Sequence, residues 1–124
     1  MNVNGIMLGL EEVTGLTVEE DSYTGKDAEY IVFNYADERG ELFGDDTAVL
    51  ETASMIINVT LTKYRRGASE TNYQGLKKEI RAYLEEHDAY DITSSVFSEK
   101  LSDKDEVRHL VFECKFTKEV ERDG

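Results

Sequence analysis

The chain has 124 residues, of which 40% are hydrophobic and 33% charged, and its formal net charge is −13. We expect one globular domain, 1–124, with frayed ends at 1–4 and 118–124. No apolar run reaches about 18 residues, and the first residues lack the basic and then apolar pattern of a signal peptide. We therefore expect neither a membrane span nor a leader. A single cysteine, Cys114, excludes an internal disulfide and fits a reducing compartment.

The negative charge is concentrated in the first half of the chain. Residues 1–62 hold 13 Asp/Glu and 2 Lys/Arg, whereas 63–124 hold 14 and 12. A field of this sign repels DNA and anionic membranes and favours a basic partner surface. The plainer alternative is that the acidic charge only keeps the protein soluble.

The chain opens with a predicted amphipathic helix at 3–14. Ile6, Leu10 and Val13 recur at helical spacing, and Gly15 follows where a helix C-cap would stand. We expect this helix to pack one face against a core.

We predict a short extended segment at 16–20 and a loop at 21–27. Residues 29–36, EYIVFNYA, predict a strand because aromatic and β-branched residues dominate them. Residues 37–46, DERGELFGDD, hold two glycines and five acids, which predicts a hairpin loop or a flexible arm.

A long strand is predicted at 49–61, where apolar residues fall on odd positions and polar residues on most even ones. At ~3.3 Å per residue it would reach about 43 Å, roughly twice a typical strand. A strand of this length is expected to project past its own core as part of a hairpin with 29–36. The odd-numbered apolar residues are Val49, Ala53, Met55, Ile57, Val59 and Leu61.

A linker at 63–70 is followed by a second helix. Thr71 and Gln74 fit a capping box, in which each side chain satisfies a free backbone N–H of the other residue. One face of the helix is marked by residues spaced three or four apart. These residues are Tyr73, Leu76, Ile80, Tyr83, Leu84 and His87.

Two more strands are predicted at 90–99 and 107–116, joined by a polar turn at 100–105. The first alternates over Tyr90, Ile92 and Val96. The second places one apolar set on a single face, namely Leu110, Phe112, Cys114 and Phe116.

These elements predict an α+β fold in the order α-β-β-α-β-β. We expect an antiparallel sheet of about four strands with two helices packed on one face. The long β-hairpin would project from it.

Few residues suggest chemistry. His109 and Cys114 have opposite parity on one strand and should point to opposite faces, and His87 ends a helix, so we expect no metal site. The acidic residues of 37–46 lack the ligand order of a calcium loop. Cys114 is expected in the core, and no nucleophile–base–orienter set or phosphate-binding motif is present. We predict no enzyme activity and no cofactor.

Candidate interaction residues lie in two segments, the acidic loop and a basic-aromatic stretch near 63–66. The second could contact a neighbour's acidic face or remain a solvated linker, and it is thin support for nucleic-acid binding in an acidic protein. The candidate interaction residues are Asp37, Glu38, Glu41, Phe43, Asp45, Asp46, Tyr64, Arg65 and Arg66.

The order of elements and several short sequence segments resemble those of the tail-terminator, or tail-completion, proteins of long-tailed bacteriophages and prophages. The resemblance covers about residues 5–117 and rests on pattern and length, with no invariant motif. It is carried by Gly15-Leu16-Thr17-Val18, Phe33-Asn34-Tyr35-Ala36-Asp37, Gly44-Asp45-Asp46, Leu61-Thr62-Lys63-Tyr64 and the helical set Leu76, Ile80 and Leu84.

The resemblance implies a non-enzymatic ring, usually hexameric, that caps the tail tube and joins it to the head connector. The partners would be other copies of the chain, the major tail tube protein and head-connector proteins. DNA would pass through the ring without specific binding. Assembly would take place in the host bacterial cytoplasm, and the protein would end in the virion tail. From its charge, we expect a monomer in isolation.

Two alternatives remain open. One is another phage neck or minor structural protein of similar layout. The other is an acidic binding module that mimics DNA and inhibits a basic nucleic-acid enzyme, which would need carboxylates spread over a whole face.

Overall fold

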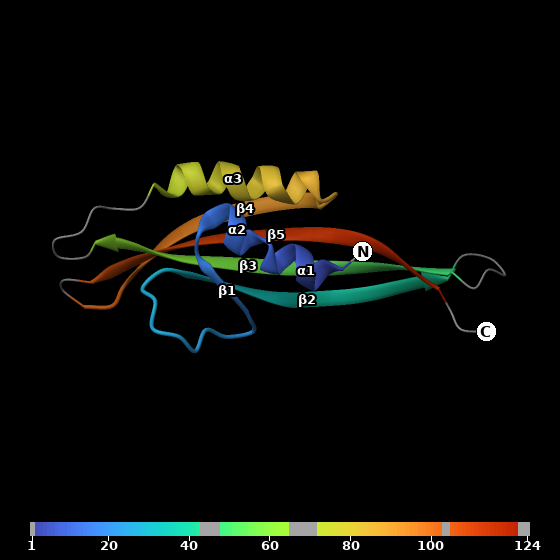
Figure 1. Cartoon of the computed structure of the whole chain (residues 1–124), viewed down its shortest axis with the longest axis horizontal. Coiled ribbons are helices and arrows are strands. Elements are labelled where there is room, and N and C mark those ends of the chain that lie inside the picture. The colour runs from blue at the N-terminus through green and yellow to red at the C-terminus, as the bar shows by residue number, and fades with distance from the viewer. Residues whose placement is uncertain (1, 43–47, 65–71, 103–104, 122–124) are drawn as a thin grey trace.

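A computed structural model describes residues 2–42, 48–64, 72–102 and 105–121, with side chains described for 2–36, 51–62, 72–102 and 105–117. In these described segments, three helices and five strands form one helix layer and one sheet (Figure 1). In chain order they are α1 (Val3–Leu8), α2 (Leu10–Thr14), β1 (Thr17–Glu20), β2 (Tyr30–Leu42), β3 (Ala48–Tyr64), α3 (Tyr73–Glu86), β4 (Tyr90–Lys100) and β5 (Glu106–Glu121).

The sheet has the strand order β1-β2-β3-β5-β4. The last four of these strands pair antiparallel, whereas β1 runs parallel to β2, with Thr17 opposite Tyr30. The predicted α+β class is confirmed, but the prediction of a wholly antiparallel sheet of about four strands is wrong. The short segment at 17–20 carries too little alternation to reveal its partner, and its pairing with β2 makes the sheet mixed.

The long central strand is confirmed and is longer than predicted, with 17 residues from Ala48 to Tyr64. Its odd-numbered residues from Ala53 to Leu61 are buried, and both Met55 and Leu61 are only 1% exposed. The period-2 pattern therefore identified the face of β3 that packs inside this one chain.

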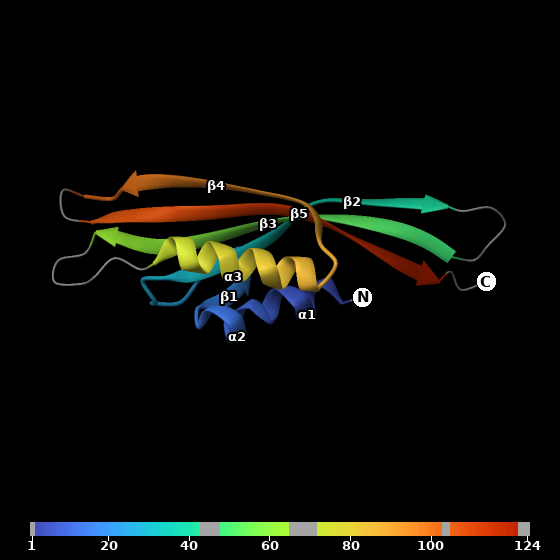
Figure 2. The same ribbon diagram turned by 90° about the horizontal axis from the view of Figure 1, so that it is seen from above.

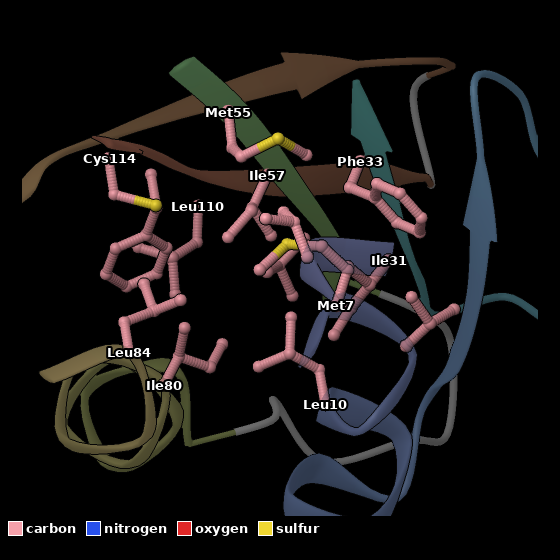
Figure 3. Packing of buried hydrophobic residues seen from close by; sticks show 14 of the residues in the cluster. Met7, Leu10, Ile31, Phe33, Met55, Ile57, Ile80, Leu84, Leu110 and Cys114 are labelled. Carbon is pink, nitrogen blue, oxygen red and sulfur yellow. The ribbon is translucent and has the colours of Figure 1, made fainter. Parts of the chain in front are cut away.

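The core lies between this face of the sheet and the helices. Figure 3 shows Ile80 and Leu84 of α3 below Leu110 and Cys114 of β5. The same view shows Met7 and Leu10 reaching toward Ile31 and Ile57. The prediction that the helices pack on one face of the sheet is confirmed.

The predicted first helix is divided into α1 and α2 at Gly9. A Cβ at this position would lie 2.2 Å from the Tyr83 hydroxyl oxygen, which donates a hydrogen bond to the Ile6 carbonyl. Gly15 closes α2 in the left-handed conformation at φ 75°, as predicted. Asn2 caps α1 and Val3 is buried.

The N-cap of α3 is Asn72, whose Oδ1 accepts a hydrogen bond from the Gly75 N–H at 3.1 Å. The predicted N-cap at Thr71 is wrong, because the helix begins one residue later and Asn72 is its N-cap. Thr71 itself lies outside the described residues. The predicted helical face is confirmed at Ile80 and Leu84, which are fully buried.

The predicted long hairpin is a three-stranded extension of the sheet. β2 continues to Leu42 through much of the segment predicted as a loop at 37–46, with a register shift between Tyr35 and Asp37. β5 also runs on, pairing Glu121 with Ala48. β3 is hydrogen-bonded to β2 on one side and to β5 on the other, and this backbone pairing keeps polar residues in strand conformation here. Figures 1 and 2 show β2, β3 and β5 extending past the end of the helix layer.

Candidate functional site

The face of the sheet opposite the helices carries a polar cluster around His109. Its Nδ1 lies 3.2 Å from Asn58 Oδ1 and 3.3 Å from Thr60 Oγ1, and its Nε2 lies 2.9 Å from Glu99 Oε2. The Phe97 ring stacks on the imidazole with centroids 4.8 Å apart. Register produces this cluster, because Thr60 and Phe97 are both direct cross-strand neighbours of His109.

The His109 cluster superficially has the parts of a hydroxyl–imidazole–carboxylate set. Asn58 and Thr60 share the same ring nitrogen, however, and Thr60 is only 6% exposed beneath its neighbours. A nucleophile needs access to substrate and a nearby group of donors for the developing oxyanion. The geometry instead fits a structural cluster that ties β3, β5 and β4 together. Sequence reasoning missed it because only the strand register brings 58, 99 and 109 together.

Cys114 lies on the opposite face from His109, as parity predicted, and belongs to the core. Burial raises the pKa of its thiol from 9.0 to about 12, which keeps it protonated and unreactive near neutral pH. His87 ends α3 and its ring packs against that of Tyr83. Within the described part of the chain, no group of three or more His, Cys, Asp or Glu could hold a metal ion.

A groove of about 380 Å³ separates α3 from the edge strand β4. Three cations of α3 line one side, and Val96 of β4, 40% exposed, lines the other. Arg81 also pairs with Glu85 at 3.0 Å, an exposed i,i+4 pair. The lining residues are Tyr73, Gln74, Lys77, Lys78, Arg81 and Val96.

This basic groove was not among the predicted interaction residues. Lys77 and Arg81 were recognisable as the outer side of an amphipathic helix, but the sequence does not indicate that β4 runs beside them. Val96 was expected to share a face with Tyr90. The register shift between Tyr90 and Thr93, with Asp91 at φ 51°, places Tyr90 opposite Lys115 and Val96 opposite Leu110.

The predicted interaction residues divide between the two ends of β3. Asp37, Glu38 and Glu41 lie in β2 near the start of β3, and Tyr64 is the last residue of β3. Among the described residues, the acidic positions of β2 and Tyr64 therefore lie at opposite ends of β3. The remaining predicted residues lie outside the described part of the chain, and they are Phe43, Asp45, Asp46, Arg65 and Arg66.

No protein-family model matches the chain, and no curated protein matches it. None of the helices in the described segments combines the length and the apolar character that crossing a bilayer requires.

Proposed function

We propose that this protein is a structural assembly subunit, and specifically a phage or prophage tail terminator. It would form a ring, hexameric as in the proteins it resembles, that caps the tail tube and joins it to the head connector. The observation that carries the proposal is the three-stranded sheet extension, in which β2, β3 and β5 run past the helix layer (Figure 2).

A sheet that outgrows its helix layer costs stability unless something covers it. Sheet faces are stabilised by packing on another layer, and exposed strand edges offer unpaired backbone groups to other chains. The extension here includes Asp37, Glu38 and Glu41 of β2. Acidic residues near a free edge blunt unspecific strand pairing and leave the extension available to a partner of complementary charge.

The proposal includes the expectations that the resemblance implies. The acidic first half would face a channel through which DNA slides, or a more basic neighbour, because carboxylates do not hold phosphates. The protein would act without catalysis or a cofactor. Self-repulsion would keep isolated copies apart at low salt, and the tube end would provide the template for ring closure.

The test is negative-stain microscopy of purified tail tubes with and without the protein. We expect wild type to cap the tubes and stop their further growth. Glu38→Lys with Glu41→Lys should abolish capping, because both changes reverse charge on the extension. Glu113→Lys with Glu86→Lys is the matched control, since it makes the same change in net charge at exposed sites elsewhere. Tubes that grow on unchanged with wild type would contradict the proposal.

A DNA-mimic inhibitor is less well supported. A mimic needs acidic charge over a continuous face, whereas Lys77, Lys78 and Arg81 line a groove on this protein. Another neck or minor structural role would share the sheet extension, and it would be distinguished by binding to the head connector without any effect on tube length.

A further inference from the structure

The topology converts the charge imbalance along the sequence into a difference between the two edges of the sheet. β1 and β2 come from the acidic first half and form one edge. β4 forms the other edge, beside α3, and both come from the nearly balanced second half. The two edges therefore differ in charge as well as in sequence.

The β4 edge is open along an 11-residue strand. In the described part of the chain β4 pairs only with β5, so its outer backbone groups face away from the sheet. Beside it lies the basic groove. Neither Lys77 nor Lys78 forms an ion pair with a described residue, and both lie next to the half-exposed Val96. An added strand would therefore meet hydrogen-bonding groups, an apolar contact and positive charge together.

The β1 edge has the complementary character. β1 pairs only with β2 among the described strands, and its last two residues are Glu19 and Glu20. Asp21 follows directly, and Asp27 lies in the loop that leads back to β2. Glu20 is exposed, and Glu19 is half-buried with its carboxylate accepting a hydrogen bond from the Thr24 N–H at 3.0 Å.

We infer that the β4 edge of one copy binds the β1 edge of a second copy, with Glu20 entering the basic groove. Glu20 is on the same face of β1 as the buried Val18, the helix side, whereas Glu19 points to the other face. Strand addition supplies backbone hydrogen bonds, and the charges select the partner edge. Lys77 and Lys78 of the first copy would lie beside the acidic end of β1 of the second. The inference rests on the proposed ring, and it identifies which surfaces hold neighbouring subunits together.

This contact is head-to-tail, because it joins two different surfaces. Every copy therefore keeps one unused edge of each kind until the chain of subunits closes on itself. Pairing of two β1 edges is disfavoured, because their carboxylates repel each other. Both properties are those that a closed ring requires.

Two charge-reversed variants test the contact. Variant one carries Lys77→Glu and Lys78→Glu, and variant two carries Glu20→Lys. Each alone would place like charges at the contact and should self-associate at least about tenfold more weakly than wild type. An equal mixture restores opposite charges at every contact and should recover association. Sedimentation velocity over a range of protein concentrations, at about 0.15 M salt so that long-range self-repulsion is screened, measures all three samples.

The control for variant one is Lys63→Glu with Lys118→Glu, which gives the same net charge but changes positions in the inner strands β3 and β5, outside the residues that line the groove. It should associate as wild type does, apart from the general increase in self-repulsion. Circular dichroism on each variant checks folding, and a misfolded variant is replaced by its single substitutions. Wild type that stays monomeric up to about 1 mM protein at about 0.15 M salt, where the long-range self-repulsion expected at low salt is screened, would overturn the inference. Variant one associating like its control, or a mixture that does not recover, would also overturn it.

Duplex DNA provides the remaining comparison. Suppose that wild type and the control bind a DNA duplex and variant one does not. The groove would then be a phosphate-binding site, and the inference would be overturned. Failure of the edge contact is distinguishable from failure of the proposed function. If variant one caps tail tubes as well as wild type, only the contact is wrong; if wild type associates through its edges but leaves tubes uncapped, only the function is wrong.

Discussion

The two faces of the sheet are built from the same strands but have different roles. On the helix side, Ile57 and Phe112 are opposite each other and fully buried. One residue along each strand, Ile56 and Glu113 are opposite each other on the open side, where Ile56 is half-buried and Glu113 is exposed. Alternation along β3 and β5 thus separates a dry face from a mixed one.

This difference indicates that most of the stabilising apolar contacts lie on the helix-side face. Apolar burial contributes about 25 cal/mol per Å², and in the described residues the fully buried large side chains belong to the helix-side core. The open face relies on polar contacts such as the His109 cluster and on aromatic stacking. It is therefore the face that can change, or accept a partner, at small cost to the fold.

The largest expected effect is a loss of stability on the helix side alone. Phe112→Ala should lower the free energy of unfolding by about 3–5 kcal/mol, because it removes a fully buried ring and leaves a cavity. The matched change Val111→Ala, on the neighbouring residue of the same strand, should cost less than about 1.5 kcal/mol. Urea unfolding followed by circular dichroism measures both. Equal losses would show that the two faces are not distinct.

The next effect tests the contact between the N-terminal helices and α3, within the helix layer. Gly9→Ala should destabilise by about 1–3 kcal/mol, because its Cβ would lie 2.2 Å from a Tyr83 oxygen that is held by the Ile6 carbonyl. Tyr83→Phe should cost about 1 kcal/mol through loss of that hydrogen bond.

The double variant should be more stable than the two losses added together, because the clash is with the hydroxyl that Phe lacks. Thermal unfolding of the four proteins completes the cycle. Strict additivity would mean that Gly9 is required for another reason.

The helix-side face was predictable because its signal is local. Alternation from Ala53 to Leu61 depends only on the neighbouring residues of one strand, and so does the spacing of Ile80 and Leu84 on α3. The pairing of β1 was not predictable, because four residues carry no period long enough to indicate a partner. The extent of β2 was missed for a related reason: glycines and acids favour a loop locally, whereas the ladder with β3 continues through them.

The candidate sites were harder to predict because they depend on contacts between distant segments. The His109 cluster joins residues 58, 99 and 109 through strand register. The groove needs α3 to lie beside β4, which the pattern of neither element reveals. The predicted segments near 37–46 and 64–66 were chosen by composition, and composition does not show that 37–42 and Tyr64 lie at opposite ends of β3.

A smaller effect is the pH dependence of stability that comes from Cys114 on the helix-side face. Burial raises the pKa of the Cys114 thiol from 9.0 to about 12 in the folded protein, so the unfolded chain loses this proton first as pH rises. The stability contributed by the protonated thiol is complete below about pH 9 and is lost as pH rises toward 12, by up to about 1.4 kcal/mol per pH unit. Cys114→Ala should flatten this decline relative to wild type in urea titrations at pH 8 to 10. Parallel curves would place the thiol outside the core.

The smallest effect concerns the open face. His109→Gln should lower the free energy of unfolding by no more than about 1.5 kcal/mol, because a partly exposed polar cluster is being altered and Gln can retain one contact to Asn58 or Thr60. Glu99→Gln should cost less than about 1 kcal/mol, since the Glu99 side chain is 56% exposed and such pairs are weak.

The informative comparison is the response of the two variants to salt. If the His109–Glu99 contact is an ion pair, raising the ionic strength should weaken wild type more than either variant, and the difference between them should shrink. Urea unfolding at low and high salt measures this. If His109→Gln lowers the free energy of unfolding as much as Phe112→Ala does, the open face contributes as much stability as the helix-side core. The two faces would then not differ in the way described.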